Sequence, residues 1–340
     1  MSHDVLNAWH RPHFTEILCA TMTDRERLGL PDRYVRDRLV EDYPAAFERI
    51  RRLETPALVA LCGDAAAELP MRIAAGNVLA CIGDPRLDAH APAMVAIPGG
   101  EVEIGLAPEA LDAVMNDYDD LGLDVKWINK ELPRHKVRLK PFAIGLYPVT
   151  NIEYRRFLEA TDHAELPSSW TFRRFPVERA NHPVHSVSAA DALAYCAWLS
   201  HETDHAFRLP GEAEWEYAAA GADGREFPWG DGFDCDRANC AETGLFTTTP
   251  VGVFPAGASA FGVLDMAGNV EEYVSDLYGP YPDGAYVDDH LSGVHGAYHV
   301  ARGGTFARFR DLARTRRRHG HNPRSSAYAM GFRLAETLHG

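Results

Sequence analysis

The densest group of chemically capable side chains in this sequence is an arginine-rich segment near the C-terminus. Residues 302–324 read RGGTFARFRDLARTRRRHGHNPR, with eight arginines and one acidic residue, Asp311. The segment carries a formal charge of 8 − 1 = +7 within a chain of net charge −15. Planar guanidinium groups bind carboxylate, phosphate or sulfate through paired hydrogen bonds. The segment therefore predicts a site for a small anionic ligand or substrate.

Six side chains of this segment form the predicted anion site. They are Arg308, Arg310, Arg314, Arg317, His321 and Asn322. An alternative interpretation is that the arginines form ion pairs with the rest of the fold, which carries −15 − 7 = −22. Some of the eight must do this under either interpretation, because so many acidic partners are present.

Histidine offers a second chemistry, since the chain has 16 histidines. His10, His13 and Glu16 are spaced so that, on a helix, they share one face. Two histidines and one carboxylate are typical ligands of non-heme Fe(II). These three residues therefore predict an iron site, and the alternative is that they are ordinary surface residues of a terminus. His319, beside His321, adds a further imidazole to the arginine-rich segment.

The elements that position these residues change in character near residue 92. Residues 1–92 are predicted to be a small helical region, with helices in 32–52 and 69–81 that must pack on something larger. Residues 93–340 are predicted to be an α+β domain with many irregular loops. Within it, 94–105 predicts a β-hairpin, and Thr150 and Ser188 predict helix N-caps. Arg208 and Glu214 are expected to form an ion pair.

Composition narrows the class of protein. The negative net charge argues against a nucleic-acid binder and against an anchor to anionic membranes. Six sparse cysteines without a CxxC pair, and an N-terminus without the pattern of a signal peptide, favour a cytoplasmic location.

Several phrases, in order, resemble the formylglycine-generating enzyme (sulfatase-modifying factor) superfamily over residues 93–340. They are IPGGEVEIG at 97–105, LYPVTNIEYRRFL at 146–158, FRLPGEAEWEYAAAG at 207–221, GVLDMAGNVEEY at 262–273, RGGTF at 302–306 and GFRLA at 331–335. The resemblance implies a loop-rich variant of the C-type lectin fold. It also implies calcium near Asn269 and Glu272, and a second calcium position at Asn239. The alternative for both asparagines is turn stabilisation through side-chain-to-backbone hydrogen bonds.

The clearest departure from this superfamily lies after RGG. Its formylglycine generators place two cysteines there that bind copper, and those positions fall on Arg308 and Ala313. Neither side chain supplies the soft thiolate that copper(I) ligation needs, and no cysteine follows Cys240. We therefore expect no formylglycine production by the cysteine and copper route.

Three functions are compatible with these features. The first is an oxidoreductase that uses non-heme iron and oxygen on a small anionic, amino-acid-derived substrate. The superfamily resemblance implies such chemistry, since its ergothioneine-type sulfoxide synthase branch uses histidine-bound iron, but residues 1–92 lack the histidine element of that branch. The second is a non-catalytic, receptor-like binding protein of the lectin type. The third is an inactive paralogue that modulates an active partner. We favour the first.

Overall fold

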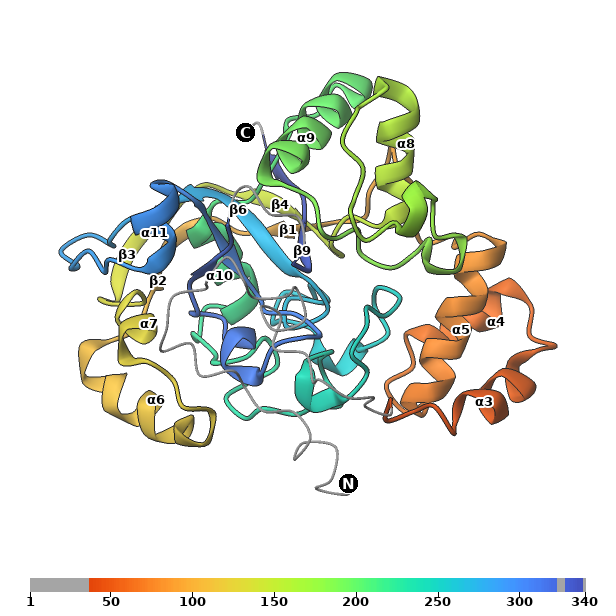
Figure 1. Cartoon of the computed structure of the whole chain (residues 1–340), viewed down its shortest axis with the longest axis horizontal. Coiled ribbons are helices and arrows are strands. Elements are labelled where there is room, and N and C mark those ends of the chain that lie inside the picture. Colours follow the sequence, from red (N-terminus) through yellow and green to blue (C-terminus); the bar gives the residue numbers. More distant parts are fainter. Residues whose placement is uncertain (1–36, 323–327, 339–340) are drawn as a thin grey trace.

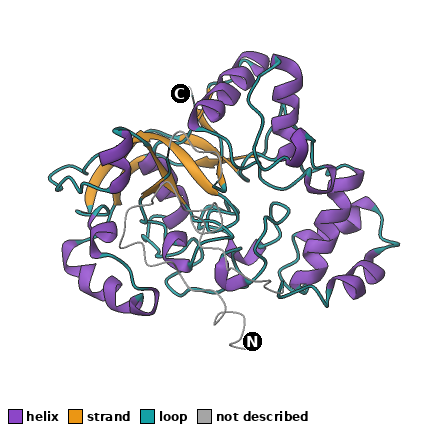
Figure 2. Cartoon of the chain, viewed as in Figure 1, coloured by secondary structure: helices purple, strands orange, loops and turns teal. Residues whose placement is uncertain are grey.

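The computed structural model describes residues 37–322 and 328–338. A group of N-terminal helices lies beside a larger unit of sheets, helices and long loops (Figure 1). The helices are α3 (Tyr43–Ile50), α4 (Thr55–Cys62), α5 (Leu69–Ile82), α6 (Leu111–Asp117), α7 (Val125–Asn129), α8 (Asn151–Thr161), α9 (Ala189–Thr203), α10 (Glu212–Ala220) and α11 (His290–His295). Much of the larger unit is loop (Figure 2), so the fold is α+β and loop-rich, as the sequence predicts.

The strands of the described chain form three small sheets. One has the order β1-β4-β10-β5, another pairs β2 with β3, and the last has the order β8-β7-β6-β9. The strands are β1 (Met94–Ile97), β2 (Gly100–Ile104), β3 (His135–Leu139), β4 (Phe142–Gly145), β5 (Phe207–Arg208), β6 (Glu271–Leu277), β7 (His299–Arg302), β8 (His319–Gly320), β9 (Met330–Phe332) and β10 (Ala335–Thr337). The third sheet therefore contains the first residue of the arginine-rich segment, Arg302 in β7, and also His319 and Gly320 in β8.

The predicted hairpin at 94–105 is wrong. Its two strands exist, but β1 pairs with β4 and β2 pairs with β3, so they enter different sheets. At Gly99, an added Cβ would lie 2.6 Å from the carbonyl oxygen of Leu139. The glycine thus allows the chain to pass close to another strand rather than to fold back on itself.

The N-terminal helices pack on the larger unit through α5. Leu69 and Ile73 share an apolar cluster with Val253 and Phe254. The Arg72 guanidinium is buried and donates from Nη1 to the carbonyl of Val253 at 2.7 Å. A short helical region cannot cover its own apolar face, and this contact supplies the missing cover.

The predicted N-caps form and fix the helices that flank the core. Thr150 and Glu153 make a capping box at α8, and Ser188 and Asp191 make one at α9. The expected pair of Arg208 and Glu214 is also present, with nitrogen–oxygen distances of 2.6 and 2.8 Å. Within the described residues, no helix is long and apolar enough to cross a membrane.

Candidate active site

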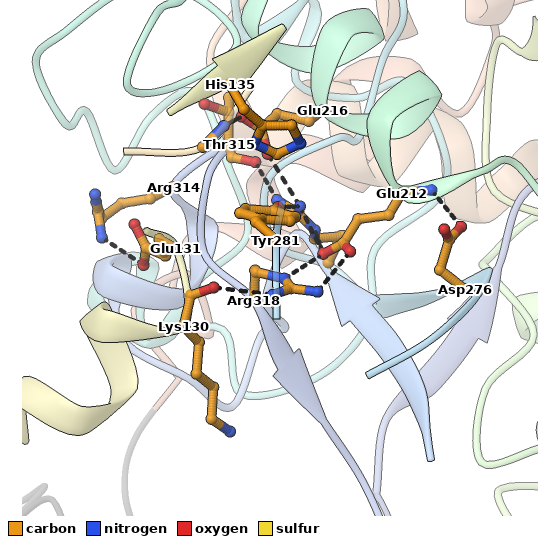
Figure 3. Close-up of polar contacts among 12 residues, drawn as sticks. Lys130, Glu131, His135, Glu212, Glu216, Asp276, Tyr281, Arg314, Thr315 and Arg318 are labelled. Atoms are coloured by element: carbon orange, nitrogen blue, oxygen red, sulfur yellow. Dashed lines mark hydrogen bonds and ion pairs between the residues drawn. The ribbon is translucent and has the colours of Figure 1, made fainter. Parts of the chain in front are cut away.

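Most of the arginine-rich segment is used inside the fold. The carboxylate of Glu212, at the start of α10, accepts two hydrogen bonds from Arg318 at 2.7 and 2.8 Å and two from Arg302 at 3.1 and 2.7 Å. Figure 3 shows Glu212 facing Arg318, whose guanidinium lies over the Tyr281 ring at 4.0 Å. Burial raises the pKa of Glu212, but the two arginines more than offset this and hold it below its usual value.

Two of the arginines predicted to bind the anion belong to this internal network. Arg314 is fully buried and pairs with Glu131 at 2.9 Å and with Glu226; Figure 3 shows the first pair. Arg317, 3% exposed, donates to the backbone carbonyls of Trp127 and Arg318. The acidic remainder of the chain supplies these partners, as the alternative interpretation stated, and we leave Arg314 and Arg317 out of the candidate site.

Arg310 lies at the edge of the network. Its guanidinium pairs with Asp120 at 2.6 Å and lies over the ring of Tyr118 at 5.3 Å. Its backbone N–H donates to Glu242 at 2.9 Å. Because Asp120 is exposed, this pair is a surface ion pair of small energetic value.

The structure brings Arg308 and His321 together on Tyr328. Arg308 Nε donates to the Tyr328 hydroxyl at 2.8 Å, and its guanidinium lies over the ring at 5.0 Å. His321 stacks on the same ring, with centroids 5.0 Å apart and an interplanar angle of 23°. Asn322 follows and is half-buried. Arg308 is also the residue onto which the resemblance to the superfamily places a cysteine of the formylglycine generators.

A buried carboxylate lies beneath this group. Glu271, at the start of β6, is 0% exposed, and its Oε1 lies 2.8 Å from Nδ1 of the partly exposed His319. Burial raises the pKa of Glu271, but His319, Arg308 and His321 lower it overall. Its Oε2 has no hydrogen-bond partner among the described residues. An ionised Glu271 requires a donor at His319 Nδ1, which leaves Nε2 as the basic nitrogen.

Backbone strain marks the same region. Ser186 has a φ of 59° and donates from its hydroxyl to the carbonyl of Tyr328 at 3.0 Å. Asn269 has a φ of 65°, and its carbonyl accepts from the N–H of Phe306 at 3.2 Å. Positive φ is uncommon in residues other than glycine, and strained residues cluster at functional sites.

The residues implied for calcium do not fit that ion. Both oxygens of Glu272 accept hydrogen bonds from Arg333, and one also accepts from the indole of Trp215. The Asn269 amide is occupied at both ends by the backbone of Thr249. Calcium needs six to eight oxygen ligands, and these oxygens are already engaged. Trp215 and Arg333 thus occupy both oxygens of Glu272.

The second implied calcium position also lacks enough oxygen ligands for the ion. Asn239 donates to the carbonyl of Thr247 at 2.8 Å, and its buried Oδ1 lacks a partner among the described residues. One amide oxygen without a nearby carboxylate is a poor calcium site. Turn stabilisation, the alternative stated for both asparagines, describes their contacts.

Groups of side chains that could hold a metal ion together are scarce among the described residues. Only Asp234, Cys235 and Asp236 there bring three histidine, cysteine or acidic ligand atoms within 4.8 Å of one another. Arg38 pairs with Asp236 at 2.8 Å and approaches Cys235 Sγ at 4.0 Å, so a cation already faces this group. His10, His13 and Glu16, predicted to bind iron, lie outside the described residues.

Sequence reasoning found some of this site and missed its centre. The sequence predicts Arg308 and His321 at the anion site and indicates His319 as a nearby imidazole. The pairing of His319 with Glu271, 48 residues apart, was missed. The consecutive acidic residues at 271 and 272 could have indicated this pairing. Neighbouring side chains in a β-strand point to opposite faces, so only one of the two carboxylates can contact a given partner.

Comparison with known proteins places this site in a family context. The family model described as sulfatase-modifying factor enzyme 1-like domain matches residues 83–338. The formylglycine-generating enzyme of Streptomyces coelicolor is 33% identical over 304 residues, covering 71% of this chain and 88% of that protein. The solved structure of PvdO from Pseudomonas aeruginosa has a TM-score of 0.55 and 29% identity, covering 73% of this chain and 95% of that one.

Two further relatives are longer than this chain. Serine/threonine-protein kinase Pkn1 of Chlamydia trachomatis is 35% identical over 226 residues, covering 61% of this chain and 35% of that protein. Hercynine oxygenase of Mycolicibacterium thermoresistibile is 33% identical over 254 residues, covering 64% of this chain and 55% of that protein. The chain thus spans about a third of Pkn1 and just over half of the oxygenase.

Proposed function

The chain belongs to the sulfatase-modifying factor family, and within it we propose a cysteine-independent oxidoreductase that acts on a small organic anion. One observation carries the proposal: a buried, ionised Glu271 holds His319 beside Arg308. A carboxylate that orients a partly exposed imidazole is the arrangement of a general acid–base pair. The similarity to hercynine oxygenase supports oxidative chemistry.

Each side chain has a definite task in this proposal. Arg308 binds the anionic group of the substrate, and Tyr328 fixes the guanidinium by hydrogen bonding and stacking. His319 takes a proton at Nε2, and the negative charge of Glu271 stabilises the imidazolium that results. A hydrogen bond to an ionised group is about twice as strong as one between neutral groups. Arg308 therefore keeps the anionic substrate in position while His319 takes the proton.

The oxidation removes two electrons and two protons from the substrate, and dioxygen accepts both to become hydrogen peroxide. One of the two protons passes through His319 on its way to the reduced oxygen. His10, His13 and Glu16 are the residues proposed to hold Fe(II), since imidazole and carboxylate suit that ion. Bound iron would supply the activation of dioxygen, which side chains alone do not provide. We propose a cytoplasmic location and a small-molecule rather than macromolecular substrate.

The first test of this function is product formation from an unfractionated mixture of small metabolites. Purified protein is loaded anaerobically with Fe(II), mixed with the metabolites, and exposed to air. We expect one anionic metabolite to be consumed and an oxidised product to appear in mass spectra. Glu271→Gln and His319→Gln should abolish the product, since each removes the acid–base pair. Glu336→Gln, whose partner is the exposed His205, is the control and should retain it.

Other outcomes would reject the proposal. A protein that binds an anion but yields no oxidised product with iron and air is a binding protein of the lectin type. Equal product from wild type and Glu271→Gln would show that the chemistry takes place elsewhere. Formylglycine production would contradict the expectation that a protein without the cysteine pair does not make this product.

A further inference from the structure

We propose that a cleft between the N-terminal helices and the larger unit binds a small monocarboxylic acid through Arg72. The cleft measures about 650 Å³ and is bordered by α3, by the start of α5 and by the loop of residues 234–237. Ligand pockets typically measure about 300–1,000 Å³, so this cleft is large enough for a small metabolite. It shares no lining residue with the group around Arg308, and the inference is therefore independent of the proposed reaction.

Arg72 differs from the other buried arginines of the described chain. Those arginines are at most 3% exposed, and each is paired with at least one carboxylate: Arg302, Arg314, Arg317, Arg318 and Arg333. Arg72 is 5% exposed, yet none of the carboxylates that the structure describes forms an ion pair with it. Its Nη1 donates to a backbone carbonyl, and its Nε is buried without a hydrogen-bond partner among the same residues. A buried charge without a partner is costly, so a bound anion would stabilise this guanidinium.

The acidic side chains that line the cleft do not neutralise Arg72. Three of them are paired with other arginines: Asp236 with Arg38 at 2.8 Å, Glu68 with Arg49 at 3.0 Å and Asp234 with Arg237 at 3.0 Å. The fourth, Asp42, is exposed and therefore hydrated. Burial lowers the pKa of Arg72, and the charges of Asp236 and Asp64 oppose this only in part. Arg72 thus carries the positive charge that a ligand of this cleft would meet.

The start of α5 adds a second attraction for an anion. Arg72 is the fourth residue of this 14-residue helix, and no acidic side chain in the first turn offsets the partial positive charge of the helix end. The N-cap residue Glu68 makes no capping hydrogen bond with its side chain, which pairs with Arg49 instead. A cation at a helix N-terminus is unfavourable on its own, so one bound anion would offset both the guanidinium and the helix end.

The lining of the cleft sets the class of ligand. Ala45, Ala67 and Ala256 line it together with Leu39 and Met71, so part of its surface is apolar and small. Burial of alkyl carbons against such residues adds to affinity. The four acidic side chains of the lining repel a doubly charged group such as phosphate. We therefore expect a ligand with a single negative charge on a short carbon chain.

Methionine methyl groups report on the cleft and on the candidate active site separately. Met71 lines the cleft, and the Met330 N–H donates to the carbonyl of Tyr328 at 2.7 Å. The full chain is isotopically labelled at the methionine methyl groups, and the Met71 signal is assigned with Met71→Leu. Hexanoate, acetate, inorganic phosphate and hexylammonium are titrated in NMR experiments, and the shift of the Met71 signal gives a dissociation constant for the cleft.

The four probes differ in charge and in chain length. We expect hexanoate to shift the Met71 signal until it saturates, and to bind at least tenfold more tightly than acetate because more apolar surface is buried. Inorganic phosphate should bind at least tenfold more weakly than hexanoate. Hexylammonium, which has the chain but the opposite charge, should leave the Met71 signal unchanged.

Two variants test the arginine and the cleft independently. Arg72→Gln removes the charge and should weaken hexanoate binding at least tenfold. Ala65→Trp places a large ring at an exposed position of the lining and should do the same while Arg72 stays in place. Ala66→Trp is the matched control, because Ala66 is exposed and adjacent but does not line the cleft, and it should bind as wild type does. Thermal unfolding shows whether each variant is folded, and Ala65→Trp decides the question if Arg72→Gln is not.

Several results would overturn the inference. It is wrong if hexanoate leaves the Met71 signal unmoved, if hexylammonium moves it equally, or if folded Arg72→Gln binds hexanoate as tightly as wild type. Tighter binding of phosphate than of hexanoate would reject the monocarboxylate class. A shift of the Met330 signal alone would place the anion at the candidate active site and reject a site in the cleft.

Discussion

Replacing Glu212 by glutamine tests the conclusion that most of the arginines hold the fold together. The change keeps the size of the side chain and removes one negative charge from between Arg302 and Arg318. Both guanidinium groups stay buried, because Arg302 is 0% and Arg318 is 3% exposed. A glutamine has one acceptor oxygen and a donor amide, so it cannot accept the four hydrogen bonds that the carboxylate accepts.

The expected cost follows from the contacts that remain. Removing one partner of a buried ion pair costs about 3–5 kcal/mol. Arg302 keeps Glu216 at 3.0 Å and the Thr315 carbonyl. Arg318 keeps the backbone carbonyls of Lys130, shown in Figure 3, and of Gly279 as its hydrogen-bond acceptors among the described residues. We therefore expect about 3 kcal/mol, the lower end of that range.

Thermal unfolding followed by circular dichroism measures this loss. An unfolding entropy of about 2.1 cal/mol/K per residue gives about 0.7 kcal/mol/K for 340 residues, so about 3 kcal/mol lowers Tm by about 4 °C. Glu101→Gln, which removes an exposed pair with Lys136, is the control and should change stability by less than about 0.5 kcal/mol. If Glu212→Gln melts within 1 °C of wild type, the network does not stabilise the fold and its arginines are open to another role.

Three further predictions concern buried charge and metals. Burial raises the pKa of Glu153 to about 7, so this carboxyl ionises at lower pH in the unfolded chain than in the folded one. The wild type should therefore lose stability as pH rises from about 4.5 to 7. Denaturant titrations of Glu153→Gln should lack this loss, and parallel pH profiles for the two proteins would contradict the prediction. Glu272→Gln should destabilise the fold by about 3–5 kcal/mol because it leaves Arg333 buried without its carboxylate. A calcium chelator should leave the Tm of wild type unchanged. A fall in Tm caused by the chelator would show that calcium does bind and stabilise the fold. Replacing His10 and His13 by alanine should reduce Fe(II) bound after anaerobic loading to below one tenth of the wild-type amount, and unchanged iron content would remove these residues from the proposal.

Local signals in the sequence were sufficient for the elements and insufficient for their pairing. Thr150 and Ser188 predicted helix starts correctly because a capping box depends on residues three apart in the chain. The strands at 94–105 were also recognised, but their partners lie beyond residue 134, and a Pro-Gly-Gly turn favours a hairpin equally well. Resemblance to the superfamily, rather than periodicity, supplied the fold.

The arginine-rich segment shows why the site could be predicted only in part. Composition located the excess of positive charge correctly, but it could not assign buried carboxylates such as Glu131 and Glu212 to particular arginines. Those pairs join residues separated by 183 and 106 positions. Arg308 donates to an aromatic hydroxyl and Arg314 pairs with two carboxylates, and only the three-dimensional arrangement shows these contacts.

The most direct test of the acid–base pair compares oxidised product from wild type and Glu271→Gln under identical iron loading. The substrate is the metabolite that wild type consumes, and product is measured by mass spectrometry at pH 7 alongside the Tm of both proteins. The account predicts that Glu271→Gln remains folded, still binds the anion through Arg308, and forms less than one hundredth of the wild-type product. A folded Glu271→Gln protein that forms the product at the wild-type rate would contradict it.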